Sequence, residues 1–192
     1  MTPVVITLAG PDGVGKSPTA WEIVRAGNKT RATFTSLAIA EPIYKAVSVI
    51  TNVPVIYLHE YKDRTFLEIA KDRSLPVPAT FFPRTVRDVL RAFGSDAVRR
   101  TFGDDVWLDH VKARISSCRV DVVVIEDART PVEWAFGKMI LLSRHGVTYS
   151  KAHETDCPPP SEMVWASYDL SASPRKTGED LAEKILSELV GK

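Results

Sequence analysis

The sequence has little cysteine, almost no net charge and no long apolar run, and each shortage excludes a class of protein. Two cysteines, Cys118 and Cys157, occur in 192 residues, far apart and without C-x-x-C spacing. This spacing argues against a zinc site and against a disulfide framework. The formal net charge is +1, so no overall field attracts nucleic acid or an anionic membrane. No apolar run reaches about 18 residues, and no signal-peptide pattern opens the chain. We therefore expect a cytoplasmic protein with reduced thiols and no membrane anchor.

The overall composition is that of an ordinary globular protein, with 44% hydrophobic and 26% charged residues. A chain of this length suffices for one well-buried domain. Internal repeats, low-complexity tracts and an obvious interdomain linker are lacking. We therefore predict a single domain over residues 1–192, with a helical insertion at about 41–117.

Short apolar runs alternate with helical patterns along the chain. The runs predicted to be strands cover residues 4–9, 33–40, 120–127 and 138–144, with an edge strand near 164–170. The predicted helices cover about 16–26, 41–50, 85–93, 104–116 and 177–190, and a further helical pattern at 55–71 is interrupted by the polar stretch "HEYKDR". This alternation predicts an α/β fold of three layers, a central parallel sheet with helices on both faces.

Two helix boundaries are predicted from local signals. Gly94, followed by Ser95 and Asp96, is typical of a helix end and a new N-cap. Thr177 is predicted to cap the C-terminal amphipathic helix, with Asp180 in its first turn.

The stretch "AGPDGVGKSP" directly follows the first predicted strand. Gly10, Gly15, Lys16 and Ser17 fit the pattern G-x-x-x-x-G-K-[ST] of a phosphate loop. Glycines let the backbone fold around an anion, and the helix N-terminus behind them attracts phosphate. Lys16 is predicted to reach the β- and γ-phosphates of ATP, and Ser17 to ligate Mg²⁺. The residues predicted to line this nucleotide site are Gly10, Asp12, Gly13, Val14, Gly15, Lys16, Ser17 and Pro18.

Two residues of this loop are unusual. Pro18 falls in the first helical turn, where an N–H has no intrahelical acceptor, although the proline removes one donor. Asp12 is an acid inside a phosphate cradle, which is unfavourable unless the carboxylate points away from the phosphates. It could hydrogen-bond a sugar hydroxyl, hold a neighbouring loop, or simply be a surface turn residue.

The apolar run "VVVI" ends in two acids, Glu126 and Asp127. An acid at this position in a phosphate-loop protein holds Mg²⁺, directly or through water. Because successive residues of a strand point to opposite faces, one of the two is predicted to do so.

Arginines gather on one face of the predicted helix at 85–93. Arg84, Arg87 and Arg91 lie within an arc of about 60°, and Arg99 follows shortly after. Phosphoryl transfer needs such cations on the acceptor phosphate and on the developing charge. A solvated basic face and a nucleic-acid backbone remain the alternatives.

Taken in order, these segments resemble the bacteriophage deoxynucleoside monophosphate kinases, a branch of the phosphate-loop nucleoside monophosphate kinases. The similarity rests on "GPDGVGKS", "AEPIYKAV", "TVRDVLRAFGSDAVRRTFGDDVWLDHVKARI", "VVVIEDARTPVEW" and the pair Ser161-Glu162. The chain differs at Arg91, where the family often has glutamine, and at Val86, which replaces the usual proline. In having an acid, Asp12, within the phosphate loop, the chain is similar to thymidylate kinases, which carry an acid in the same loop.

The resemblance implies transfer of the γ-phosphate of ATP, with Mg²⁺, to a deoxynucleoside monophosphate. It makes Asp127 and Arg129 the family's D-x-R pair, with Asp127 serving Mg²⁺ and Arg129 approaching the transferred group. It also makes Arg87 and Arg99 candidates for the acceptor phosphate and the transition state. Together with the phosphate loop and the arginine face, these assignments predict that Lys16, Arg99, Asp127 and Arg129 are catalytic and that Arg84, Arg87, Arg91 and Arg99 bind the acceptor. A segment at about 129–137 is expected to act as a lid. The choice between a monomer and a homodimer is left open by the sequence.

Two further functions remain alternatives. Arg91 motivates a kinase for a modified deoxynucleotide, or for a hydroxymethylated base within DNA, which is the alternative that includes nucleic acid. A nucleotide-dependent switch or ATPase would use the same phosphate loop without an acceptor.

Overall fold

The computed structural model describes residues 2–150, 157–171 and 173–190, and these form two compact units. The first unit consists of Met1–Ile39 and Leu108–Lys192, and the second of Ala40–Trp107. The second unit is thus a continuous piece of chain inserted into the first.

The first unit is built on a five-stranded sheet with the order β2-β3-β1-β4-β5. Its strands are β1 (Val4–Ala9), β2 (Phe34–Leu37), β3 (Val122–Ile125), β4 (Lys138–Ser143) and β5 (Val164–Asp169). All four neighbouring pairs are parallel, and β3, β1 and β4 are fully enclosed by neighbours. The predicted parallel sheet is confirmed, including β5 at its edge.

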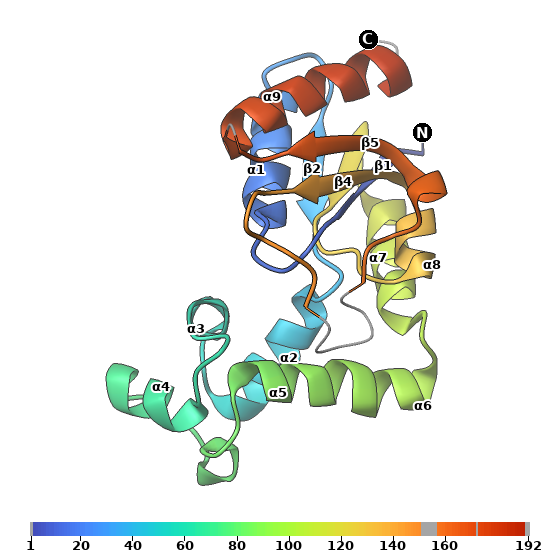
Figure 1. Cartoon of the computed structure of the whole chain (residues 1–192). Coiled ribbons are helices and arrows are strands. Elements are labelled where there is room, and N and C mark those ends of the chain that lie inside the picture. The colour runs from blue at the N-terminus through green and yellow to red at the C-terminus, as the bar shows by residue number, and fades with distance from the viewer. Residues whose placement is uncertain (1, 151–156, 172, 191–192) are drawn as a thin grey trace. The chain divides into compact units, whose positions relative to one another are not determined.

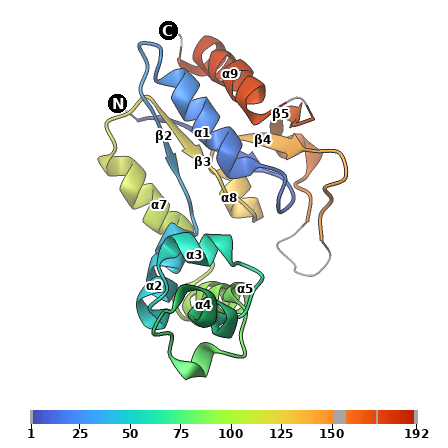
Figure 2. The same ribbon diagram turned by 90° about the vertical axis from the view of Figure 1, so that its left-hand side faces the viewer.

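Helices cover both faces of this sheet (Figures 1 and 2). Helices α1 (Lys16–Gly27) and α9 (Pro174–Ile185) lie side by side on one face. Helices α7 (Val106–Ser117) and α8 (Pro131–Ala135) cover the other. Alternate residues of β1 serve the two faces: Ile6 and Leu8 are fully buried against α1 and α9, and Thr7 is buried on the opposite side. The three-layer α/β fold predicted from the sequence is therefore confirmed.

Helices α1 and α9 approach each other at a glycine. A Cβ on Gly178 of α9 would stand 2.4 Å from the Cβ of Glu22 and 2.9 Å from its backbone carbonyl carbon. Only a residue without a side chain fits there, so the two helix backbones pack directly on each other. Gly27, the last residue of α1, packs in the same way: a Cβ there would overlap the ring of Phe34 at the start of β2.

The second unit is helical. Its elements are α2 (Glu41–Thr51), α3 (Val55–Glu60), α4 (Phe66–Arg73), the 3₁₀ turn η1 (Ala79–Phe81), α5 (Val86–Arg91), the π-helical stretch η2 (Ala92–Arg99) and α6 (Arg100–Phe102). Its core includes Val47, Leu58, Phe66, Ile69 and Val86, all fully buried. Helices α4 and α5 both begin with a capping box, formed by Thr65 with Glu68 and by Thr85 with Asp88.

The prediction that a helix ends at Gly94 is wrong. The chain continues from α5 through η2 into α6 without leaving helical geometry. Gly94 is buried, and a Cβ there would stand 2.8 Å from Cδ1 of Ile43 in α2. Its carbonyl oxygen accepts a hydrogen bond from the indole N–H of Trp107 at 2.9 Å. The glycine therefore serves close packing rather than helix termination.

The prediction that Thr177 caps the C-terminal helix is also wrong. Ser173 is the N-cap, with its side chain accepting from the backbone N–H of Lys176, and Pro174 is the first helical residue. Thr177 lies a full turn inside α9 and is buried against the sheet unit. The Ser-Pro pair is the better start signal, since proline is favoured at the first helical position.

Among the described residues, we find no helix with the length and apolar character needed to cross a membrane.

Candidate functional site

The loop between β1 and α1 is shaped by three glycines with positive φ. Gly10, Gly13 and Gly15 have φ values of 147°, 77° and 111°. At Gly10 a Cβ would collide with the carbonyl oxygen of Leu142 at 2.5 Å, so no other residue fits against β4 there. Val14 anchors the loop, because its side chain is fully buried in the core between the sheet and α1. The sequence therefore holds an open backbone curve at the end of a buried strand.

Lys16 lies within this curve. Its Nζ donates to the carbonyl oxygens of Gly10 at 2.7 Å and Pro11 at 2.9 Å, and the residue is 9% exposed. An ammonium held by its own loop is a fixed positive charge at the centre of the turn. This placement agrees with the predicted cation for nucleotide phosphates.

The N-terminus of α1 offers donors to an anion. Gly15 is the N-cap and provides no side-chain cap, and the first turn contains no acidic residue. Helix amides in the first turn have no intrahelical acceptor, and the helix dipole favours negative charge there. Ser17 is exposed at this end, next to Pro18. Pro18 is the third helical residue, so it removes an N–H that would otherwise face the same ligand.

Arg144 is a cation beside this loop that the sequence reasoning missed. It directly follows β4, and its Nη2 lies 3.1 Å from the place where a Cβ on Gly15 would stand. The carboxyl ends of β1 and β4 meet at the same edge of the parallel sheet, which brings the two residues together. A basic residue directly after a parallel strand was the available signal.

The segment after β3 is tied down at several points. Oδ1 of Asp127 accepts a hydrogen bond from the backbone N–H of Ile39 at 2.7 Å, which joins this segment to the chain leaving β2. The carbonyl oxygen of Ala128 accepts from the indole N–H of Trp134 at 3.4 Å. Asp127 thus has a structural role whatever else it does. The neighbouring acid Glu126 is half-buried and forms other contacts, and nothing in the geometry assigns Mg²⁺ to either one.

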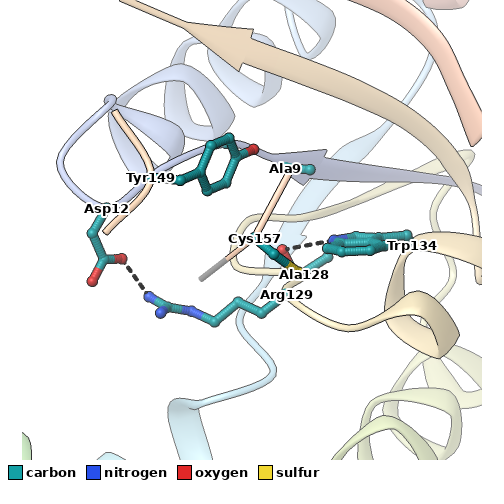
Figure 3. A pocket seen from close by; sticks show the side chains of 8 residues that line it. Ala9, Asp12, Ala128, Arg129, Trp134, Tyr149 and Cys157 are labelled. Atoms are coloured by element: carbon teal, nitrogen blue, oxygen red, sulfur yellow. Dashed lines mark hydrogen bonds and ion pairs between the residues drawn. The ribbon is translucent and has the colours of Figure 1, made fainter. Parts of the chain in front are cut away.

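Arg129 is held at both ends. Its backbone N–H donates to Oε2 of Glu133 at 2.7 Å, and Thr130 and Glu133 form the capping box of α8. Glu133 is 4% exposed, so this anchor is buried. At the other end, Nη2 of Arg129 forms an ion pair with Oδ1 of Asp12 at 2.6 Å (Figure 3). The T-P-V-E pattern was a recognisable signal for the cap. The segment at 129–137 that the sequence suggests as a lid includes α8, in which Trp134 is buried.

The ion pair borders a small cavity. The cavity has a volume of about 10 Å³, room for one water molecule. It is lined by Ala9, Gly10, Asp12, Ala128, Arg129, Trp134, Tyr149 and Cys157. Figure 3 shows the side chains of Asp12 and Arg129 pointing toward each other beside it. Of the three readings of Asp12, the one in which it holds a neighbouring loop agrees with this contact.

The four arginines expected to bind an acceptor belong to the second unit. Arg87 pairs with Asp63 through both Nε, at 2.5 Å, and Nη2, at 3.1 Å. The pKa of Asp88 is lowered mainly by its hydrogen bond with Thr85, and the nearby positive charges of Arg84 and Arg91 lower it further. Arg99 is half-buried in η2. Within the described residues, the side chains of Arg84 and Arg91, on either side of Asp88, form no hydrogen bond or ion pair of their own.

Within the described part of the chain, no cluster of three or more His, Cys, Asp or Glu side chains could hold a metal ion.

Neither a protein-family model nor a curated protein matches the sequence. Solved structures do match. One is a gluconokinase from Sinorhizobium meliloti 1021, 14% identical, with a TM-score of 0.44, covering 99% of this chain and 97% of that one. Another is a shikimate kinase from Bacteroides thetaiotaomicron, also 14% identical, with a TM-score of 0.43 and coverages of 97% and 98%.

The first unit has a phosphate-loop fold. The strand order, the loop between β1 and α1, and Lys16 within it establish this without the two solved structures. At such identities and TM-scores, neither match says what this chain acts on.

Proposed function

We propose that the protein is an ATP-dependent phosphotransferase, specifically a deoxynucleoside monophosphate kinase that converts a dNMP to its dNDP. The observation that carries the proposal is Lys16, held by two loop carbonyls at the glycine-lined N-terminus of α1. This arrangement supplies a fixed cation and helix amides for a triphosphate. The order of motifs described above supports the narrower choice of acceptor.

The donor side is assigned to the loop of the first unit. The amides at the start of α1 and Nζ of Lys16 would bind the phosphates of ATP, and Arg144 would add a second cation beside Gly15. Lys16 and the α1 amides are fixed in place before nucleotide binds, so little reorganisation of these donors accompanies the reaction.

A magnesium ion fits the chemistry of this donor set. Ser17 presents an exposed hydroxyl at the helix start, and Asp127 has a second carboxylate oxygen besides the one bonded to Ile39. Hydroxyl, carboxylate, phosphate and water oxygens are the ligands that Mg²⁺ takes. When bound, the ion would neutralise charge on the phosphates.

The acceptor side is assigned to the arginines. We infer that Arg84, Arg87, Arg91 and Arg99 bind the acceptor phosphate, and that Arg129 stabilises charge on the group in transfer. Arg129 is suited to this because its backbone is pinned by buried Glu133. Little acid–base chemistry is needed, since phosphoryl transfer depends mainly on positioning and charge stabilisation.

The test is an ADP-release assay with ATP and Mg²⁺, run separately with dAMP, dCMP, dGMP, dTMP and 5-hydroxymethyl-dUMP. We expect strong stimulation by one or a few of these acceptors. Lys16→Ala should lower the rate by at least ~100-fold, because it removes a preorganised cation. Lys29→Ala is the matched control, since Lys29 lies exposed just beyond the other end of α1. Full activity of Lys16→Ala would refute the proposal.

Two alternatives predict other outcomes. Arg91 motivates a modified nucleotide or a base within DNA as the acceptor. Stimulation by 5-hydroxymethyl-dUMP alone would identify the modified nucleotide, and transfer of labelled phosphate from ATP to an oligonucleotide, in a parallel assay, would identify the base within DNA. Hydrolysis of ATP that no acceptor accelerates would instead identify a switch or ATPase.

A further inference from the structure

The carboxylate of Asp12 is an unusual feature of the phosphate loop. A negative charge there opposes phosphate binding unless a cation neutralises it. The structure supplies that cation, since Arg129 lies 2.6 Å away although it is 117 residues distant in sequence. The acid and the arginine together carry no net charge, so the loop keeps its attraction for phosphate through Lys16 and the α1 amides.

Without the contact to Asp12, nothing would hold the side chain of Arg129 in one conformation. Its backbone is fixed by Glu133 and by the start of α8, but its side chain is 36% exposed and has several rotatable bonds. An exposed arginine samples many rotamers, and holding it in one costs free energy that must be met at each turnover. The ion pair with Asp12 already restricts the Arg129 side chain in the folded protein, before any substrate binds.

The contact leaves most of the guanidinium available. Arg129 donates to Asp12 through Nη2, and among the described residues its guanidinium has no other partner. An arginine carries five N–H donors in a rigid fork, so Nε and Nη1 remain for a second anion. Asp12 therefore orients the group without consuming it.

We propose that Asp12 is a positioning residue, which orients Arg129 from within the phosphate loop for the transferred phosphoryl group. This inference rests on the proposed phosphotransferase function. It assigns Asp12 no contact with substrate, in contrast to a role on a sugar hydroxyl.

The test is a double-mutant cycle on the full chain, measured as kcat and KM for ATP and for the acceptor. Asp12→Ala should lower kcat about 10-fold and change either KM less than about 3-fold, because orientation matters only where Arg129 acts. In an Arg129→Ala background, Asp12→Ala should have no further effect on kcat. Asp12→Glu, which keeps the charge, should recover part of the loss. Asp109→Ala is the matched control, since Asp109 is an exposed ion-pair partner on α7.

Other outcomes overturn the inference. Equal losses from Asp12→Ala in both backgrounds, or a rise in acceptor KM as the main effect, would mean that Asp12 touches substrate itself. Wild-type protein that transfers phosphate to no acceptor would refute the proposed function instead.

A second measurement needs no turnover. Arginine-selective NMR of the free protein should show slow rotation about the Nε–Cζ bond of Arg129 that becomes fast in Asp12→Ala. Unchanged rotation would overturn the inference even where the enzyme is active, and restricted rotation in an inactive protein would confine the failure to the proposed function.

Discussion

The side chain of Asp127 and the backbone of Ile39 are joined by a hydrogen bond of 2.7 Å between the ends of two adjacent strands. Ile39 follows β2 and Asp127 follows β3, so the bond continues the pairing of these strands beyond their last residues. The carboxylate that the sequence suggests for magnesium is therefore also a structural acceptor.

The structural role of Asp127 and its proposed magnesium role can be separated by substitution. Asp127→Asn keeps an oxygen that can accept from Ile39 but loses the charge. We expect it to lower Mg²⁺-dependent transfer at least about 10-fold while the thermal midpoint stays within a few degrees of wild type. Asp127→Ala should lose activity and also stability, because a buried N–H loses its partner. Wild-type activity in Asp127→Asn would remove Asp127 from the magnesium site.

Arg144 is predicted to act on the nucleotide donor. Arg144→Met keeps much of the side-chain length and removes the charge beside Gly15. We expect KM for ATP to rise about 5- to 10-fold, the effect of one partly exposed charge-assisted contact. Arg119→Met, an exposed arginine after α7, is the control. An unchanged KM for ATP together with a raised acceptor KM would move Arg144 to the acceptor.

Thr7 offers a test of stability inside the sheet. Its Oγ1 is fully buried and has no hydrogen-bond partner among the described residues, whereas Oγ1 of Thr19, equally buried, donates to the carbonyl of Gly15 at 2.8 Å. Thr7→Val should therefore leave stability unchanged or raise it by up to about 1 kcal/mol. Thr19→Val should lower it by about 1 kcal/mol. Urea unfolding measures the free energy of unfolding of both variants. A larger loss of stability in Thr7→Val than in Thr19→Val would show that Thr7 has a hydrogen-bond partner.

The capping boxes of the second unit predict a pH dependence. Hydrogen bonds with Thr65 lower the pKa of Glu68 from 4.5, and those with Thr85 lower the pKa of Asp88 from 3.8. A carboxyl with a lowered folded pKa stabilises the fold above its unfolded pKa, and this contribution is lost as pH falls toward the folded value. Helicity of the second unit should therefore weaken below these unfolded values.

The double variant Glu68→Gln and Asp88→Asn checks this expectation. Its thermal midpoint, followed by circular dichroism between pH 2 and 6, should depend less on pH than that of wild type. The two proteins should differ most at pH 6 and converge in acid. Parallel curves would mean that these carboxyls do not couple folding to pH.

The parts of the fold that the sequence predicted correctly depend on local patterns. The strand ending at Ala9 and the loop after it are encoded in one run of apolar residues followed by glycines, and the parallel sheet follows from the alternation of elements. Gly94 was misread because its reason lies in Ile43, a residue of another helix. Local spacing contains no information about such a contact.

The candidate site divides in the same way. Lys16 and Ser17 were predictable because the motif fixes their positions in the turn. The partner of Asp12 was not, because Arg129 reaches it only once β1 and β3 are paired. Arg144 was missed for a similar reason, since its proximity to Gly15 depends on β4 lying beside β1.

The packing of α9 on α1 has a consequence for synthesis on the ribosome. Gly178 contacts Glu22, and Arg25 bonds Glu179 across 154 residues of sequence, so α1 leaves the ribosome long before its partner exists. The second unit, being continuous, has all its residues by Trp107. A nascent chain therefore carries α1 without the helix that packs against it until the residues after Pro174 emerge, and apolar surface exposed during that interval favours aggregation.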